Sequence, residues 1–378
     1  MTYETENAAP AAVLVGFTIR NVRDGRVHID DPLAELRELV ESMGSRVVGE
    51  VFQNNMKRYE RFLISRHLVN MAKVEVERTG AGLVCVDDTL SGSQRANIED
   101  EIGCEVLDRT EVILQIFARR AHTADGILQV ELAQLTYLLP RLRGRGGKEL
   151  SALGGGIGTR GPGETKLETD RRVIAKRISK LKKEIELVGR RRGIQRRKRK
   201  KSGIPMVSLV GYTNSGKTTL LNAISGEQAY ADDRLFATLD PLTRRVFVPK
   251  LNREVLFTDT VGFIDRLPTE LIAAFKSTLE EVTFADLLAV LVDGSESGWP
   301  RKLEVVDRTI KEIGAGEIPR VIVFTKSDLY SEANETIGYA GTDEEFSGGG
   351  VKVSAINGEG IDKFFDSISG ILGQRGDS

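Results

Sequence analysis

The residues best suited to chemistry lie at 211–218, where the chain reads GYTNSGKT. This is the G-x-x-x-x-G-K-[ST] pattern of a phosphate-binding loop, in which glycines let successive backbone N–H groups turn toward an anion. An apolar run at 206–210 precedes the loop and a helical pattern at 219–224 follows it. The strand, loop and helix that the motif needs are thus present. We predict a nucleotide phosphate site here rather than a glycine turn that binds nothing.

The loop positions have separate predicted roles. Lys217 would reach the β- and γ-phosphates, and the Thr218 hydroxyl would bind Mg²⁺. The start of the following helix adds the attraction of its positive N-terminal end. Further contacts to the nucleotide are expected from Gly211, Tyr212, Thr213, Asn214, Ser215, Gly216 and Thr219.

A second motif, D-x-x-G, occupies 259–262 at the end of a predicted strand. Asp259 would hold the Mg²⁺ shell, and the amide of Gly262 would contact the γ-phosphate. Between the two motifs, Thr238 is the candidate for the threonine that binds Mg²⁺ and the γ-phosphate, with Thr243 as the alternative. This segment should become ordered with the nucleoside triphosphate and loosen with the diphosphate. Lys217, Thr238 and Gly262 are therefore the predicted catalytic residues.

A third motif at 325–328 reads TKSD, which matches [NT]-K-x-D, and follows another predicted strand. Guanine presents two adjacent donors, N1–H and the 2-amino group, and the Asp328 carboxylate can accept both, whereas adenine lacks that pair. Lys326 would cover the ring with its stem, and Thr325 completes the motif. After the last predicted strand, Ser354 and Ala355 are placed to offer a backbone N–H to guanine O6. Such a site rejects the wrong base because its polar groups would stay unpaired.

The elements that must position these motifs divide the chain into three predicted domains. Strands and helices alternate over 1–109, which predicts a small parallel α/β domain. Over 110–203, two helical patterns repeat apolar residues in steps of three and four, which favours an antiparallel helical hairpin over two separately packed helices. The first pattern is largely helical from about Thr110 to Leu139, and Pro140 should end it. Residues 204–378 alternate again and predict a Ras-like P-loop domain with a mostly parallel sheet.

Charge is unevenly distributed along a chain whose formal net charge is −1. The predicted hairpin tip, 141–163, is rich in glycine and arginine, and the second helix ends in the basic clusters 190–192 and 196–201. A flexible linker and a solvated charged face are the alternatives to a functional interpretation. Together, the basic tip and helix end favour contacts to the phosphates of structured RNA, recognised by shape and charge.

Other patterns limit the class of protein. The two cysteines, Cys85 and Cys104, have no metal-type spacing and indicate no disulfide framework, which fits a reducing cytoplasm. The first ten residues carry no signal-peptide pattern, and no apolar run reaches the roughly 20 residues that a membrane span needs. We expect a cytoplasmic monomer without a membrane span.

The chain resembles the HflX family of translational GTPases, in the TRAFAC class. The resemblance rests on GGGIGTRGPGETKLETDRR (154–172), GYTNSGKTTLLN (211–222), FATLD (236–240), DTVGFI (259–264) and TKSD. It implies binding to the large ribosomal subunit and its RNA near the peptidyl-transferase region, and splitting or recycling of stalled ribosomes. In related GTPases with Asn at the position of Asn214, its side-chain oxygen helps hold K⁺ at the phosphates; the alternative is that it only stabilises the loop.

Hydrolysis should be slow in the isolated protein. Ras-like enzymes orient water with Gln directly after the D-x-x-G glycine, and here that position is Phe263, which cannot orient water. Ribosomes would accelerate the reaction by ordering the switch segments. Two rival functions stay open: a nucleotide-switched RNA-binding or RNA-remodelling protein that needs no hydrolysis, and an ATPase or small-molecule kinase, against which Asp328 argues.

Overall fold

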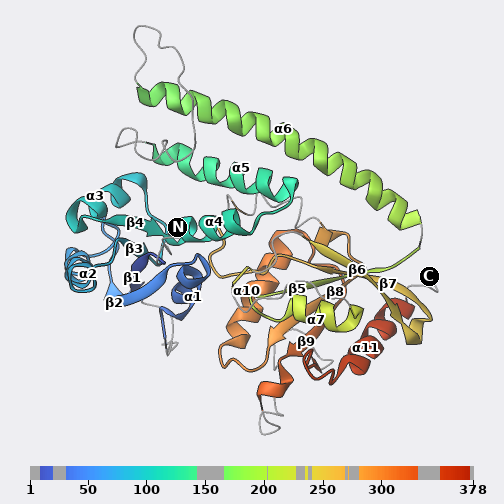
Figure 1. The fold of residues 1–378 in the computed structure, drawn as a ribbon. Helices are drawn as coiled ribbons and strands as arrows, with labels where there is room; N and C mark the ends of the chain where they lie inside the picture. Colours follow the sequence, from blue (N-terminus) through green and yellow to red (C-terminus); the bar gives the residue numbers. More distant parts are fainter. Residues whose placement is uncertain are drawn as a thin grey trace, which may run out of the picture. The chain divides into compact units, whose positions relative to one another are not determined.

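The computed structural model describes residues 9–19, 31–142, 166–201, 203–226, 235–236, 241–268, 271, 281–330 and 350–374. These residues divide into two compact units (Figure 1). The first comprises the described residues within 1–119 and 128–184, and the second comprises those within 120–127 and 185–378. Each unit has its own sheet.

The first unit contains a four-stranded parallel sheet in the order β2-β1-β3-β4. Its elements are β1 (Ala11–Ile19), α1 (Ala34–Ser42), β2 (Arg46–Met56), α2 (Arg66–Thr79), β3 (Leu83–Val86), α3 (Gly92–Ile102) and β4 (Glu105–Asp108). Strand β3 is buried at every position because parallel strands are covered on both faces by their crossover helices. The predicted parallel α/β fold of this part is confirmed.

The helical region that follows differs in two respects from the sequence prediction. The stretch from Thr110 to Leu139, predicted to be the largely helical first arm of the hairpin, forms two helices, α4 (Arg109–Arg120) and α5 (Ala124–Arg141). Thr123 begins the second helix, because its hydroxyl accepts the Gly126 amide at 3.0 Å and so satisfies a free helix-start donor. Pro140 lies inside the last turn of α5 instead of ending the helix before it.

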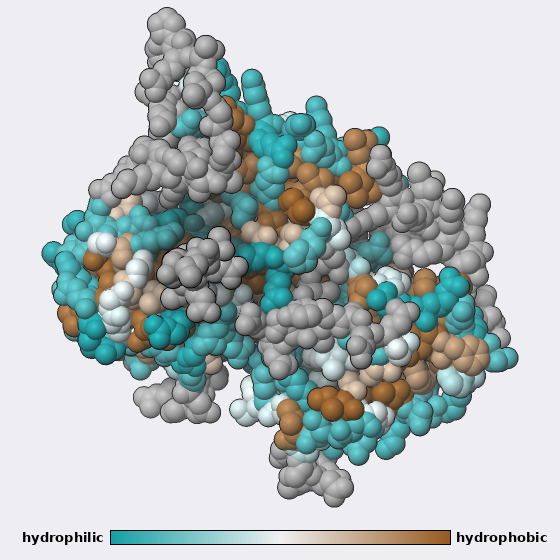
Figure 2. Space-filling model, in the orientation of Figure 1, coloured by the Kyte–Doolittle hydropathy of each residue, from teal (hydrophilic) through white to brown (hydrophobic). Residues whose placement is uncertain are grey.

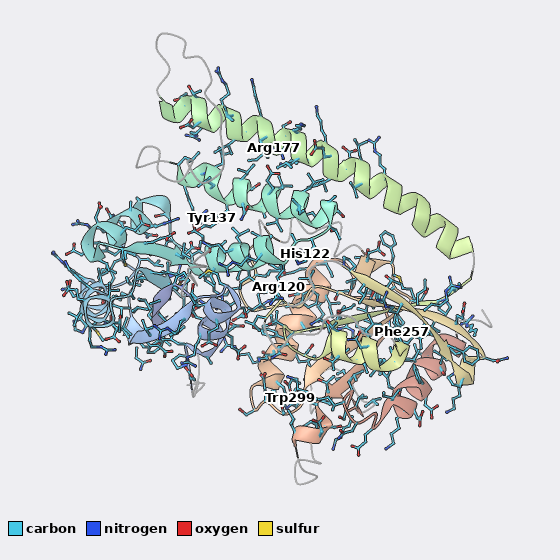
Figure 3. All side chains as sticks on the ribbon, viewed as in Figure 1. Arg120, His122, Tyr137, Arg177, Phe257 and Trp299 are labelled. Atoms are coloured by element: carbon cyan, nitrogen blue, oxygen red, sulfur yellow. The ribbon has the colours of Figure 1, made fainter. Side chains whose placement is uncertain are left out.

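Helices α5 and α6 (Lys166–Lys201) lie side by side and run in opposite directions, as expected for a hairpin (Figure 1). Of the predicted seam positions, Leu132 and Leu135 of α5 and Ile174 and Leu181 of α6 are buried, whereas Leu128, Leu139, Ile178, Ile185 and Val188 are half-buried. Arg177, labelled on α6 in Figure 3, donates to both carboxylate oxygens of Glu131 at 2.6 Å. The glycine-rich tip predicted at 141–163 lies outside the described residues from 143 onward.

The second unit contains a six-stranded sheet in the order β10-β9-β8-β5-β7-β6. All pairs are parallel except β6 with β7 at the edge. Its strands are β5 (Met206–Gly211), β6 (Leu242–Val248), β7 (Arg253–Asp259), β8 (Leu287–Asp293), β9 (Arg320–Thr325) and β10 (Val351–Lys352). Its helices include α7 (Lys217–Ser225), α10 (Trp299–Glu312) and α11 (Ile361–Gln374), with short turns η2 (Pro249–Leu251) and η3 (Ser327–Leu329). The mostly parallel P-loop fold is confirmed.

The core of this unit lies between the sheet and its covering helices. Phe257, labelled in Figure 3 on β7, packs against Phe364 and Phe365 of α11, with ring centroids 6.2 and 6.4 Å apart. Strands β5 and β8 are buried along their whole length. This packing holds the carboxyl ends of β5, β7 and β9 at one edge, where a parallel sheet places its ligand site. The sequence also predicts a helix at 269–281, and most of that stretch lies outside the described residues.

Among the helices that can be described, none combines the length and the apolar character that a membrane crossing needs.

Candidate functional site

The loop between β5 and α7 is tightly folded around its own backbone. Gly216 has φ +81° and Asn214 has φ +60°, so two of its residues adopt left-handed conformations. A Cβ on Gly211 would lie 2.4 Å from the Leu291 carbonyl oxygen, so only glycine fits against β8 there. Thr219 lies in the first turn of α7, half-buried. The local geometry is that of an anion-binding turn at a helix start.

Lys217 is buried in this loop. Its Nζ donates to the carbonyl oxygens of Tyr212 at 2.7 Å and Gly211 at 3.4 Å. Burial lowers the pKa of Lys217 to about 8, and the negative charge of Asp259 opposes that shift. Phosphate oxygens would supply this ammonium group with the counter-charge that its surroundings offer only in part.

Two hydroxyls of the loop also suit an added acceptor. Within the described part of the chain, Thr213 Oγ1 and Ser215 Oγ are buried and make no hydrogen bond. Buried polar groups are normally paired, so unpaired hydroxyls in a phosphate-type loop are consistent with a site that a ligand or water completes.

The two residues predicted to bind Mg²⁺ meet directly. Thr218 Oγ1 donates to Asp259 Oδ2 at 2.7 Å, and Asp259 is fully buried at the end of β7. A hydroxyl and a carboxylate are hard oxygen ligands, and Mg²⁺ in nucleotide enzymes takes its other ligands from phosphates and water. The residues present therefore fit the ion. Thr238, the third predicted ligand, lies outside the described residues.

Thr243, the alternative to Thr238, belongs to β6. It pairs with Thr258 of β7, and the two hydroxyl oxygens are 3.0 Å apart. The structure thus places Thr243 in the ladder of the edge strand.

The D-x-x-G segment packs against the phosphate loop. Thr213 donates its amide to the Phe263 carbonyl at 2.8 Å, and Phe263 donates its amide to the Gly211 carbonyl at 3.0 Å. A Cβ on Gly262 would lie 2.8 Å from Thr213 Cα and 3.1 Å from Lys217 Nζ. Gly262 is thus held where its backbone borders the predicted γ-phosphate position. The Phe263 side chain is 1% exposed and belongs to the core.

The TKSD motif is joined to the same loop. Thr325 Oγ1 donates to the Ser215 carbonyl at 2.9 Å, so this motif and the phosphate loop are directly linked. Lys326 has φ +56° and pairs with Asp293 of β8 at 2.7 Å. Asp328 accepts a hydrogen bond from Ser354 Oγ at 2.6 Å, which orients its carboxylate.

The last predicted contact needs a refinement. The Ser354 amide donates to the Glu359 carbonyl at 3.0 Å. Of the pair predicted to face guanine O6, the amide of Ala355 is therefore the candidate donor, and Ser354 acts through its hydroxyl on Asp328.

Several residues around the site were missed in the sequence. Asp293 ends a buried strand beside the TKSD strand, which is a signal that could have found it. Arg301 and Arg308 of α10 contact Asp265, three residues after Gly262, and the Tyr212 hydroxyl accepts the amide of Asp265. No sequence motif indicates these last contacts, because they join separate segments through the fold.

Three family models match successive parts of the chain. "GTP-binding GTPase N-terminal" matches residues 30–118, "GTP-binding GTPase Middle Region" matches 120–199, and "50S ribosome-binding GTPase" matches 206–326. Among solved structures, the crystal structure of SsGBP in complex with GDP aligns with a TM-score of 0.50 at 24% identity, covering 97% of this chain and 99% of that one. This likeness supports the fold.

Curated relatives extend over most of the chain. GTPase HflX of Caldanaerobacter subterraneus subsp. tengcongensis is 47% identical over 339 residues, which are 90% of this chain and 76% of the relative. GTPase HflX of Escherichia coli (strain K12) is 40% identical over 367 residues, 97% of this chain and 84% of the relative. The sequence resemblance is therefore confirmed, and the chain belongs to the HflX family of GTPases.

Proposed function

We propose that this protein binds GTP with Mg²⁺, hydrolyses it to GDP and phosphate, and couples the cycle to splitting or recycling of stalled ribosomes in the cytoplasm. The observation that carries the nucleotide part is the convergence of three motifs at one sheet edge. The Thr325–Ser215 and Thr213–Phe263 hydrogen bonds link the base motif, the phosphate loop and the D-x-x-G segment.

The residues have complementary roles in this proposal. Lys217 holds the β- and γ-phosphates, Thr218 and Asp259 hold Mg²⁺, and Gly262 offers its amide to the γ-phosphate. Bound Mg²⁺ would neutralise charge on the phosphates. Thr238 is proposed as a further ligand of the ion. A K⁺ ion at Asn214 stays a hypothesis.

Guanine selectivity is assigned to Asp328, which accepts two donors of the base while Ser354 holds the carboxylate in place. Lys326 covers the ring, and the amide of Ala355 donates to O6. Adenine would leave Asp328 without both partners, which disfavours ATP.

Hydrolysis is proposed to be slow until a partner orders the site. The side chain that follows Gly262 is Phe263, which is buried in the core and offers no polar atom to a water molecule. Catalysis then depends on backbone amides, the lysine and the ion, all of which act through position.

The ribosomal part of the proposal is supported by the family and by α6. The family model that matches residues 206–326 is described as a 50S ribosome-binding GTPase, which favours the large ribosomal subunit as the binding partner. Lys176, Lys180, Lys182, Lys183 and Arg190 of α6 are exposed. In Figure 2 the surface over α6 carries many hydrophilic side chains. We propose that the predicted domain 110–203 of a monomeric protein contacts ribosomal RNA phosphates.

Sedimentation with ribosomes tests the proposal. With a non-hydrolysable GTP analogue, we expect the protein to bind ribosomes and split them into subunits. With GDP it should dissociate from the subunits, and with ATP analogues it should neither bind nor split ribosomes. Lys217→Ala is the matched variant and should not split ribosomes with any of these nucleotides. Splitting by Lys217→Ala without nucleotide would instead favour the RNA-remodelling alternative.

A further inference from the structure

Tyr212, the second residue of the phosphate loop, makes a contact that the nucleotide motifs do not explain. Its side chain is buried, and its hydroxyl accepts the backbone amide of Asp265 at 2.7 Å. The two residues are 53 positions apart in the chain. A side chain of the loop therefore holds the backbone of the segment that follows Gly262.

The carboxylate of Asp265 is held from the other side by α10. Arg308 Nη2 lies 3.2 Å from Asp265 Oδ1, and Arg301 Nη2 lies 3.3 Å from Asp265 Oδ2. The two arginines are seven residues apart, two helical turns, so they lie on the same face of α10. Both arginine side chains are more than half exposed, so each ion pair alone adds little stability. Their effect is on position: they bracket the carboxylate.

These contacts complete a ladder between loop and segment. The Thr213–Phe263 and Phe263–Gly211 main-chain bonds form two rungs, and the Tyr212–Asp265 bond forms the third. Gly262 precedes the first rung and approaches Thr213 so closely that a Cβ would meet Thr213 Cα at 2.8 Å. The ladder therefore sets how far the Gly262 amide lies from the phosphate loop.

We propose that Tyr212 is a positioning residue for GTP hydrolysis, acting with Asp265, Arg301 and Arg308 to hold Gly262 against the phosphate loop. The proposal rests on the proposed GTPase function. It follows from the absence of a water-orienting side chain at Phe263, since a site that relies on backbone amides needs that backbone held in place. Ground-state binding of GDP, which has no γ-phosphate, does not use the Gly262 amide.

The test compares Tyr212→Phe with the wild-type protein. Phenylalanine keeps the buried ring and removes only the hydroxyl. We expect kcat for GTP hydrolysis, with ribosomes present, to fall about fivefold, the value of one hydrogen bond, while the Kd for GDP changes less than about twofold. Fluorescence of Trp299, the single tryptophan and labelled in Figure 3, checks folding, because Trp299 and Tyr212 line the same small pocket beside α10.

The matched control is Tyr330→Phe. Among the residues that the structure describes, the Tyr330 hydroxyl is buried without a hydrogen-bond partner, so its removal breaks no hydrogen bond. Its kcat should stay at the wild-type value. An equal loss of kcat in both variants, or a parallel loss of GDP affinity in Tyr212→Phe, would assign Tyr212 a general packing role and overturn the proposal.

Asp265→Asn provides an independent second variant, since it keeps the backbone amide and weakens the contacts to Arg301 and Arg308. It should lower kcat in the same direction, and the double variant Tyr212→Phe/Asp265→Asn should lose less than the product of the two single effects, because both act on one segment. Fully multiplicative losses contradict the shared role. A wild-type protein that binds GDP but hydrolyses no GTP overturns the proposed function as well, whereas an active wild type with an unaffected Tyr212→Phe overturns the positioning role alone.

Discussion

The ammonium group of Lys217 illustrates how the fold prepares single residues for a ligand. It lies buried against two carbonyl oxygens, and burial lowers its pKa to about 8. Bound phosphates would add negative charge at hydrogen-bond distance and raise that pKa again. Nucleotide binding and protonation of Lys217 are therefore linked.

This linkage predicts a pH dependence of GDP affinity. Below pH 8 Lys217 is mostly protonated with or without nucleotide, so affinity should be nearly constant. Above pH 8 the free protein loses the proton that the complex retains, so the Kd should rise by up to about tenfold per pH unit until the pKa in the complex is reached. Calorimetry from about pH 7 to about pH 9.5, in buffers of different ionisation enthalpy, would show proton uptake on binding.

Ser354→Ala serves as the control for this measurement. It removes the hydroxyl that donates to Asp328 and should weaken GDP binding by about fivefold at every pH, without changing the slope. A GDP affinity of the wild type that stays constant over the whole alkaline range would refute the role assigned to Lys217.

At the scale of elements, two glycines at the carboxyl edge of the sheet approach neighbouring segments too closely to carry a side chain. Gly262 approaches the loop from β7, and Gly211 approaches β8 from β5. Both glycines lie where strands end at the same edge of the sheet. At these two positions the site is assembled by close backbone approaches that leave no room for a side chain.

Gly262→Ala should therefore separate hydrolysis from binding. The added Cβ would lie 2.8 Å from Thr213 Cα, so the segment must move away from the loop. We expect kcat to fall by about 100-fold, as for a displacement of about 1 Å in an active site. The free energy of unfolding should decrease by about 1–3 kcal/mol. GTP turnover and thermal denaturation would measure the two effects.

Gly298→Ala offers the comparison at the start of α10. A Cβ there has no atom within 4 Å among the described residues, so activity and stability should stay close to wild type. If Gly262→Ala behaves like Gly298→Ala, the close approach of the two segments is not needed for hydrolysis.

At the scale of the whole molecule, the formal net charge is only −1 although helix α6 is strongly basic. The exposed lysines of α6 are offset by acidic residues elsewhere, so attraction to RNA must be local. Counterion release then makes the affinity for ribosomes depend on salt in proportion to the number of phosphates that the protein neutralises.

Replacing Lys182 and Lys183 by Glu should weaken ribosome binding and reduce the log–log salt slope by about one for each phosphate that the variant no longer neutralises. GDP binding should not change. Lys363→Glu, an exposed lysine on α11, is the control and should leave both unchanged. Sedimentation at several KCl concentrations gives the slopes, and equal slopes for all variants would exclude these lysines of α6 from RNA binding.

The sequence by itself determined the local parts of this protein. The phosphate loop, D-x-x-G and TKSD are short motifs, and the residue types in each indicate which ligand group they bind. Buried strands such as β8 follow from continuous apolar runs in the sequence. The end of α4 was missed, because residues 121–123 contain no glycine or proline that would mark a break, while the cap of Thr123 started a new helix.

Only the tertiary structure decided which groups meet. The hydrogen bonds of Thr325 to Ser215 and of Asp265 to Tyr212 join residues 110 and 53 positions apart. Such contacts depend on the order and register of strands, which periodicity does not encode, because one apolar strand pattern fits many neighbours. For the same reason the lowered pKa of Lys217 could not be predicted, since it arises from burial that the whole sheet and its helices create together.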